Sequence, residues 1–546
     1  MQLESNRSSR QAECQPDERT EMPYSRNCEN VRTGSLRATS QRGAIGSLLA
    51  LLLALPLAQA QLTYVPTADG ITITAYTGTD AVYTVPSIIE GSVVTRIGPD
   101  AFSWNQSLTQ VTIPDSVISI ADGAFSWCPE LTSVSIGKGV RDIGASVFRF
   151  CQKLSQIDVD SSNPAYSSLD GILFNRYRTT LLVFPGGKTG SYTIPDTVSS
   201  IQAHAFGCNP GLTAIELGAG IAQIDPDAFE TCDALTSVTV NPLNDTYSDV
   251  DGVLLNKDQT SLLMFPAGRS GDYAVPEGVL DIADHAFSWA THVTSVSLPD
   301  SVTSIGAEAF GWCSALTNLS LGAGVSSIGE FAFRFCESLT AIDVHPDNPH
   351  YASMNGVLFN KALTRLVQYP EGRSGCYLIP RGVTTVGANA FFDCDGLTSV
   401  TIPSSVVMIE NYAFYHCGQL NALYFGGNAP ATGLDLLKGA NASQVYYLAE
   451  NSGWGSTFAG RPTAVWTHAE PTIVKSSMTF TYNSVSFVAS SQGATQWVLI
   501  ESSPSFSNPT WTAVSTNLME AGFAPVNLLM STDQTSSYYR CRVIIP

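Results

Sequence analysis

A short pattern of hydrophobic and polar positions recurs along most of the chain. One example is LTSVTIPSSVVMIENYAFYHC, residues 397–417. The apolar residues of LTSVTI (397–402) alternate with polar ones at the end and precede a proline, which is typical of a short strand that stops at a turn. The apolar pair in VVMI (406–409) predicts a return path. The step Ala413-Phe414 then predicts a short helical turn that places the phenylalanine in the interior.

This unit occurs ten times, and each copy carries a phenylalanine after Ala or, once, after Val. The ten residues are Phe102, Phe125, Phe148, Phe206, Phe229, Phe287, Phe310, Phe333, Phe391 and Phe414. The number of residues between successive phenylalanines takes either a short or a long value. The order of short and long steps restarts at Phe287, which indicates duplication of a whole block of repeats. No unit can bury its apolar face alone, so the units must stack into a solenoid. Ten L-x-x-Φ-x-Φ segments, where Φ is apolar, predict ten strands aligned in one parallel sheet.

Each of the three longer steps contains an insertion. The insertions lie near 159–195, 240–276 and 344–380. Each has Asp-Gly or Asn-Gly followed by alternating apolar residues, which predicts a β-hairpin that extends from a coil. Their shared tyrosines, Tyr166, Tyr247 and Tyr351, are candidate binding residues, with packing of the insert onto the stack as the alternative.

The pattern changes at both ends of the array. Residues 1–43 are expected to be an unstructured extension, and 44–60 have the apolar segment and Ala-Gln-Ala ending of a secretory signal peptide cleaved before Gln61. Residues 61–100 predict a β cap for the solenoid of 101–466. Short strands separated by Ser, Asn and Pro in 471–546 predict a small all-β module like a β-sandwich.

Composition narrows the choice of location and partner. The chain has 546 residues, of which only 14% are charged, and a net charge of -20, which argues against binding to nucleic acid or to anionic membranes. The apolar run within 44–60 is shorter than the roughly 20 residues of a membrane-spanning helix. We therefore expect an exported chain, secreted or at the cell surface, with no integral membrane span after cleavage.

Eight cysteines occupy almost the same place in the repeat. Seven stand three residues after the repeat phenylalanine, and one, Cys208, stands two after it; the seven are Cys128, Cys151, Cys232, Cys313, Cys336, Cys394 and Cys417. A repeating interior position suits a small apolar residue such as free Cys. Disulfides between neighbouring coils are the alternative in an exported protein, but side chains that point in parallel rarely meet the required torsion. Buried thiols are therefore the prediction.

Aromatic residues two positions after the repeat phenylalanine form two runs over adjacent coils. The candidate binding residues are Trp104, Trp127 and Phe150 in the first run and Trp289, Trp312 and Phe335 in the second. A ladder of exposed rings can stack on the faces of sugars. The alternative is that these rings pack against the adjoining coils.

The sequence contains no recognisable catalytic or metal-binding arrangement. Its seven histidines show no HExxH spacing, and no G-x-S-x-G segment is present, so we expect neither an enzyme nor a metal or other cofactor. The tail, 471–546, has no histidine and only three acidic residues. It offers few titratable groups for an active site.

The unit VTSIGAEAFGWCSALTNLSL, residues 302–321, resembles the BspA-type leucine-rich repeats of bacterial and protist surface proteins, and the likeness extends over roughly 64–466. The resemblance implies a leucine-rich-repeat solenoid, secretion or surface display, and repeats without enzymatic activity. The expected function is a non-enzymatic extracellular binding or adhesion scaffold that recognises a protein or a glycan. In the alternative, the repeats are a spacer for a C-terminal module with enzymatic or carbohydrate-binding activity.

Overall fold

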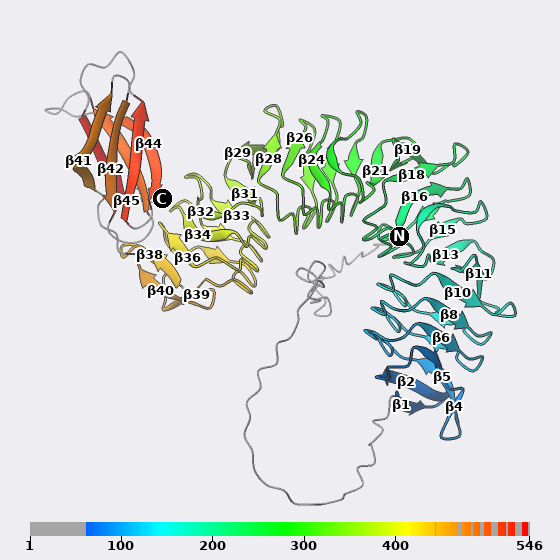
Figure 1. Ribbon diagram of the computed structural model, residues 1–546. Coiled ribbons are helices and arrows are strands. Elements are labelled where there is room, and N and C mark those ends of the chain that lie inside the picture. Colours follow the sequence, from blue (N-terminus) through cyan, green and yellow to red (C-terminus); the bar gives the residue numbers. More distant parts are fainter. Residues whose placement is uncertain are drawn as a thin grey trace, which may run out of the picture. The chain divides into compact units, whose positions relative to one another are not determined.

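The computed structural model describes residues 62–442 and 444–466, and the backbone of six strands between 472 and 543. The extension and signal peptide expected in 1–60 lie outside the described residues. Within the described part the chain winds through successive β-coils, and no residue there lies in a helix. The predicted repeat solenoid is confirmed (Figure 1).

One side of each coil carries the strand of the L-x-x-Φ-x-Φ segment, which pairs in parallel with its equivalents in the next coils. These strands, together with further strands at the ends of each group, form four separate sheets, which follow here in spatial order; β39 alone pairs antiparallel, with β40. They are β10 (Gln156–Val159), β8 (Ser133–Ile136), β6 (Gln110–Ile113) and β3 (Val82–Thr84); β14 (Gly190–Thr193), β16 (Leu212–Leu217) and β18 (Ser237–Val240); β22 (Gly271–Ala274), β24 (Val293–Ser297), β26 (Asn318–Leu321) and β28 (Ala341–Val344); and β32 (Gly375–Leu378), β34 (Leu397–Ile402), β36 (Ala422–Phe425), β38 (Gln444–Tyr447), β40 (Arg461–Val465) and β39 (Thr457–Phe458).

The expectation of one parallel sheet along the whole array is therefore wrong. The sheet stops at each insertion, because the strand before the insertion pairs with the strand of the preceding coil but not with the strand that follows the insertion. At β10, for example, the amide of Ile157 donates to the carbonyl oxygen of Gly171 in the insertion hairpin, at 3.0 Å. The hairpin thus takes the edge on which the next coil's strand would have paired.

The other side of the solenoid is built from shorter strands that are also parallel. They are β5 (Ser92–Ile97), β7 (Ser119–Ile120) and β9 (Asp142–Ile143); β13 (Thr180–Val183), β15 (Ser200–Ile201) and β17 (Gln223–Ile224); β21 (Ser261–Met264), β23 (Asp281–Ile282), β25 (Ser304–Ile305) and β27 (Ser327–Ile328); and β31 (Arg365–Gln368), β33 (Thr385–Val386), β35 (Met408–Ile409) and β37 (Ala431–Thr432). In the first sheet, β1 (Leu62–Thr67), β2 (Gly70–Tyr76) and β4 (Ile88–Ile89) complete the N-terminal end, with β1 antiparallel to β2.

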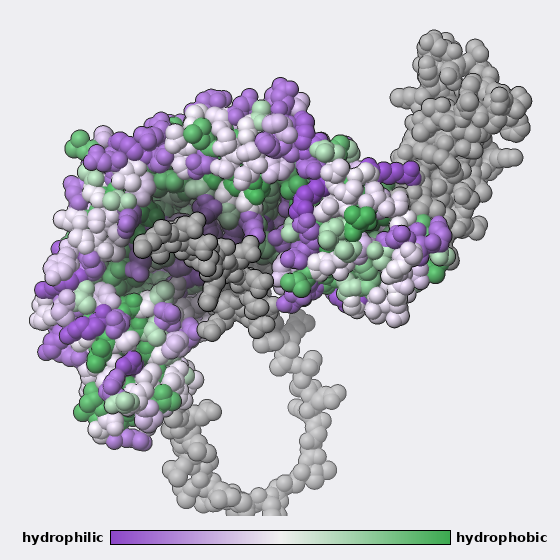
Figure 2. All heavy atoms as spheres, turned by 180° about the vertical axis from the view of Figure 1, so that it is seen from behind, coloured by the Kyte–Doolittle hydropathy of each residue, from purple (hydrophilic) through white to green (hydrophobic). Residues whose placement is uncertain are grey.

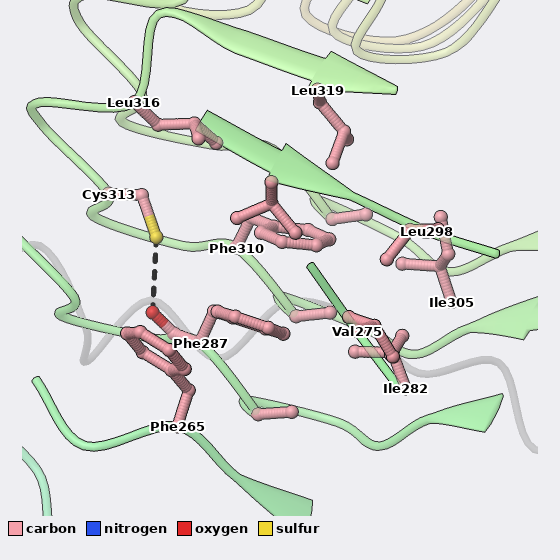
Figure 3. Close-up of a cluster of buried hydrophobic side chains, with 14 of the residues drawn as sticks. Phe265, Val275, Ile282, Phe287, Leu298, Ile305, Phe310, Cys313, Leu316 and Leu319 are labelled. Carbon is pink, nitrogen blue, oxygen red and sulfur yellow. Dashed lines mark hydrogen bonds between the residues drawn. The ribbon is translucent and has the colours of Figure 1, made fainter. Parts of the chain in front are cut away.

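The core runs between these two sets of strands. All ten repeat phenylalanines are buried, and their rings stack from coil to coil, as for Phe287 and Phe310 with centroids 4.8 Å apart (Figure 3). The residues around them are mainly Leu, Ile and Val from both sets of strands. Each coil thus buries its apolar face against its neighbours, as a stacked repeat requires.

The chain turns at each phenylalanine without forming a helix, which differs from the short helical turn predicted there. In the coil of Phe414, Tyr412 and His416 flank the ring with φ of 57° each, in the left-handed region. A right-handed helix cannot continue through two such residues. The segment is a sequence of tight turns, such as the bond from the amide of Tyr415 to the carbonyl of Tyr412.

Each insertion contains a hairpin and then a complete additional coil. The hairpins are β11 (Tyr166–Leu169) with β12 (Ile172–Asn175), β19 (Tyr247–Val250) with β20 (Val253–Asn256), and β29 (Tyr351–Met354) with β30 (Val357–Asn360). After the first hairpin, Leu181 and Phe184 are buried, and the ring of Phe184 lies 5.1 Å from that of Phe206. Phe265 and Tyr369 occupy the same place in the other two insertions. The insertions are thus part of the core, not only protruding hairpins.

Beyond Trp466 the described backbone forms six antiparallel strands. β41 (Thr472–Thr481), β42 (Ser484–Ser491) and β45 (Gly522–Leu529) make one sheet of three. β44 (Thr512–Met519), β43 (Gln496–Ser503) and β46 (Tyr538–Val543) make a second.

Candidate binding surface

The aromatic residues singled out in the sequence lie outside the core, at the edge of the solenoid that is formed by the turns around the repeat phenylalanines. We call this edge the turn edge. All six have φ between 56° and 66°, in the left-handed region. This conformation turns the side chain away from the buried phenylalanine two positions earlier. It costs a non-glycine residue roughly 1 to 2 kcal/mol, an amount comparable to the contribution of a good aromatic pair.

The first run forms a continuous stack of rings over three coils. The ring centroids of Trp104 and Trp127 are 4.4 Å apart with an interplanar angle of 4°, and those of Trp127 and Phe150 are 3.8 Å apart. The stack therefore holds neighbouring coils together, as the packing alternative requires. Trp104 at its end is nevertheless 58% exposed, which leaves apolar ring surface in contact with solvent.

The second run repeats this arrangement. Trp289 and Trp312 stack at 4.6 Å and 6°, and Phe335 follows at 5.2 Å. The guanidinium of Arg334 lies 4.0 Å from the centroid of Trp312 and is paired with Glu308 at 2.8 Å. The face of Trp312 is thus partly covered, and Trp289 is the end of this stack.

Hydrophobic residues are not gathered into one large exposed patch on the face that Figure 2 draws. There they appear as separate green areas among hydrophilic residues. Apart from Trp104, the exposed large hydrophobic residues include isolated ones such as Leu243 and Tyr177. Isolated apolar residues of this kind are ordinary on protein surfaces.

The three insertion tyrosines are half-buried. The hydroxyl of Tyr166 accepts a hydrogen bond from the amide of Ile143, at 2.9 Å. Tyr247 accepts the equivalent bond from Ile224 at 3.2 Å, and the hydroxyl of Tyr351 donates to the carbonyl of Ser326 at 3.5 Å. These contacts tie each insertion to the coil before it, as in the packing alternative.

The turn edge is interrupted by three notches that the sequence analysis missed. In the first insertion coil, Leu181 pairs with Ile201, and Ile201 pairs with Ile224 in the coil after that. Fewer residues separate Leu181 from Ile201 than separate Ile201 from Ile224, so the insertion coil is shorter than the coil that follows it. Most of the residues that the insertion coil lacks would precede its interior aromatic ring, where the other coils have a residue with φ in the left-handed region. The sequence signal was Phe-Pro-Gly-Gly, Phe-Pro-Ala-Gly and Tyr-Pro-Glu-Gly in place of the usual Ala-Phe unit.

We number the notches by their insertions. The first notch, of about 170 Å³, is lined by residues including Phe150, Phe184 and His204. The second, of about 190 Å³, lies between the coils of Phe229 and Phe287, and the third, of about 480 Å³, is lined by residues including Tyr351 and Arg365. Each notch is a recess in the row of turns.

Ionic side chains are concentrated at the second notch. Glu230 pairs with Arg149 at 2.5 Å, and its other carboxylate oxygen lies 2.8 Å from Nδ1 of His204. Burial disfavours the charged carboxylate, but the contact with His204 and the charge of Arg149 outweigh it, so the pKa of Glu230 is lowered. Across the notch, His285 lies 3.7 Å from Asp227 and 3.9 Å from Glu308. The contacts with Arg149 and His204 hold the carboxylate of Glu230 in place.

The repeat cysteines take no part in this surface. All nine described cysteines are free thiols, and the eight that stand two or three residues after a repeat phenylalanine are buried. Six of them donate to the carbonyl of the phenylalanine one coil earlier, at 3.0 to 3.2 Å; these are Cys128, Cys151, Cys232, Cys313, Cys336 and Cys417. Asn105 and Asn209 fill the same slot and donate their amides to carbonyls of the preceding coil. The slot therefore favours a small donor, and not only a small apolar residue.

Within the described ranges, no group of three or more His, Cys, Asp or Glu is placed to hold a metal ion. The same residues contain no helix long and apolar enough to cross a membrane. What the turn edge offers is hydrogen-bonding side chains beside flat aromatic rings. That combination suits recognition of a ligand through stacking and hydrogen bonds.

Comparison with solved structures finds bacterial leucine-rich repeat proteins. A leucine-rich cell surface protein from Faecalibacterium prausnitzii is 27% identical, over 68% of this chain and 94% of that chain, with a TM-score of 0.36. A leucine-rich repeat protein from Eubacterium ventriosum is 20% identical, over 73% and 98%, with a TM-score of 0.44. The pneumococcal vaccine antigen PcpA is 16% identical, over 74% and 99%, with a TM-score of 0.34.

No curated protein matches the chain. The family model described as the BspA type leucine rich repeat region matches it in six copies, over residues 83–189, 182–250, 272–367 and 377–447. These ranges cover more than half of the sequence and contain all ten of the repeat phenylalanines that stack in the core. The chain belongs to the family of BspA-type leucine-rich repeat proteins.

Proposed function

We propose that this protein is a non-enzymatic binding or adhesion scaffold outside the cell, which recognises an extracellular protein or glycan through its repeat array. The family supports a repeat scaffold, and the segment 44–60 supports export. Repeat arrays commonly bind partners through extended surfaces of this kind. No metal, cofactor or nucleic acid is part of the proposal.

The observation that carries the proposal is the turn edge with its two aromatic stacks. Trp104 and Trp289 each end a stack of flat rings, and polar side chains follow the same edge. Rings at the ends of stacks can bury apolar area against a partner without reorganising the core. Aromatic residues of this type often dominate binding energy in interfaces.

The test is a binding screen with the mature chain, Gln61–Pro546, against immobilised matrix proteins and glycans. Replacing Trp104 and Trp127 together by Ala should weaken binding of a captured partner at least tenfold if the first stack contributes. A matched control is Leu243→Ala, which removes a side chain that is 78% exposed and outside both stacks. Turnover of polysaccharides or esters by the mature chain would contradict the non-enzymatic part of the proposal.

A further inference from the structure

The second notch has a flat aromatic wall. Trp312 covers one face of the Trp289 ring at 4.6 Å and 6°, and the preceding coil has Ala267 where an aromatic residue would stand. Trp289 lines the notch and is half-buried. Its second face therefore borders the recess instead of another ring.

The opposite wall of the notch is polar. Asp227 and Glu230 come from the coil of Phe229, while His285 comes from the same coil as Trp289. The side chain of Glu230 is only 14% exposed and is fixed by Arg149 and His204, whereas that of Asp227 is 43% exposed. Carboxylates in such pairs keep lone pairs that can accept hydrogen bonds from hydroxyl groups.

We propose that the second notch binds one pyranose ring of a neutral glycan, with the C–H face of the sugar on Trp289 and its hydroxyls on Asp227 and His285. The inference rests on the proposed function, because it names the ligand class of the same array. The notch, at about 190 Å³, is below the roughly 300 to 1,000 Å³ of pockets for drug-sized ligands, which fits a single ring.

Charge separates this ligand from the alternatives. Three carboxylates and two guanidiniums line the notch, and both Arg149 and Arg334 are already paired with Glu230 and Glu308. An anionic ligand would meet these three carboxylates, while both guanidiniums are already engaged in ion pairs. A lysine side chain from a protein partner would have to compete with Arg149 and Arg334, which already pair with two of the three carboxylates. The hydroxyl groups of a neutral sugar need no countercharge, and they can donate hydrogen bonds to the carboxylate oxygens without displacing the arginines.

The experiment uses the mature chain and a set of methyl pyranosides of neutral hexoses, observed by saturation-transfer NMR. At least one glycoside should receive saturation, strongest at the C–H protons of one ring face. Trp289→Ala should weaken its binding about tenfold or more, and Trp289→Phe should weaken it less. Asp227→Asn, which leaves the stack intact, should also reduce affinity several-fold.

Tyr177→Ala is the matched control, because it removes an aromatic ring that is 83% exposed and lies outside the notch. It should bind like the unchanged protein, and thermal melting of each variant should show that the coils remain folded. Absence of saturation transfer to every glycoside, or equal binding by Trp289→Ala, would overturn the inference. Binding of a lysine-rich peptide at the notch would also overturn it. The proposed function would survive any of these results if the array still bound a macromolecular partner.

Discussion

The thiol of Cys313 donates a hydrogen bond to the backbone carbonyl oxygen of Phe287 in the preceding coil, with Sγ 3.1 Å from the oxygen (Figure 3). The same oxygen also accepts a hydrogen bond from the amide of Ala290 at 3.0 Å, so the thiol supplies its second hydrogen bond inside the buried core. Cys313→Ala should therefore lower the free energy of unfolding by about 1 to 2 kcal/mol. Denaturant titration measures this loss. Ala290→Cys, which introduces a thiol in the slot one coil earlier, should not lower stability, and a large loss there would contradict the role of donor.

The redox state of the same cysteines can be tested directly. Burial raises the pKa of Cys336 and Cys394 well above that of a free thiol, so both should react slowly in the folded protein. After denaturation without reductant, most of the ten cysteines in residues 61–546 should react with an alkylating reagent. Mass spectrometry counts the modified residues. If eight stayed blocked until a reductant was added, the repeat cysteines would be disulfide-bonded.

The ring of Phe310 lies between those of Phe287 and Phe333, at 4.8 and 5.9 Å, and is fully buried. Phe310→Ala should cost about 3 to 5 kcal/mol and loosen the neighbouring coils, because it leaves a cavity in a continuous stack. The control Leu243→Ala should change stability by less than about 0.5 kcal/mol. A loss below about 1 kcal/mol for Phe310→Ala would be inconsistent with stacking as a main source of stability.

The carboxyl group of Glu371 is buried in the Tyr369 coil, where the other insertion coils have Gly186 and Ala267. Burial, with nearby acidic groups such as Asp393, raises the pKa of Glu371 to about 10. Between the unfolded value of about 4.3 and this value, the unfolded chain has lost a proton that the folded chain keeps. The contribution of Glu371 to stability should therefore be highest below pH 4 and fall as pH rises, by up to about 1.4 kcal/mol per pH unit.

Glu371→Gln removes this dependence. The substitution should stabilise the protein by on the order of 2 kcal/mol at pH 7 and change little at pH 4, as measured by denaturant titration at both pH values. Glu371→Ala, which restores the residue type of Ala267, should follow the same trend. Equal effects of Glu371→Gln at the two pH values would show that the carboxyl group is ionised in the folded protein.

The repeat itself could be predicted from the sequence, because a phenylalanine that returns within the same pattern of apolar and polar residues indicates stacked units with a shared core. Each such ring, Phe125 for example, is buried against its equivalents. The coils of Phe184, Phe265 and Tyr369 could not be found in this way, because a shortened turn and a proline replace the usual unit. Their apolar residues follow the Asp-Gly or Asn-Gly turn and therefore indicate only a hairpin, and the division of the long sheet could not be predicted for the same reason.

The candidate site was predicted in part. The position of Trp104 and its neighbours in the repeat indicated a row of rings, but spacing alone could not show which rings keep a free face. That depends on what the adjoining coil places opposite, such as Ala267 before Trp289. The pair Arg149 and Glu230 is separated by 81 residues and forms only because the coils between them are stacked.

The most direct test of the central claim compares binding by the mature chain, 61–546, with binding by shortened chains of 61–466 and 471–546. The array supplies the aromatic stacks and the notches, so the chain of 61–466 should retain the binding of the mature protein to its extracellular protein or glycan, and the chain of 471–546 should bind nothing. If 471–546 bound the partner and 61–466 did not, the repeats would be a spacer, and recognition by the array would be contradicted.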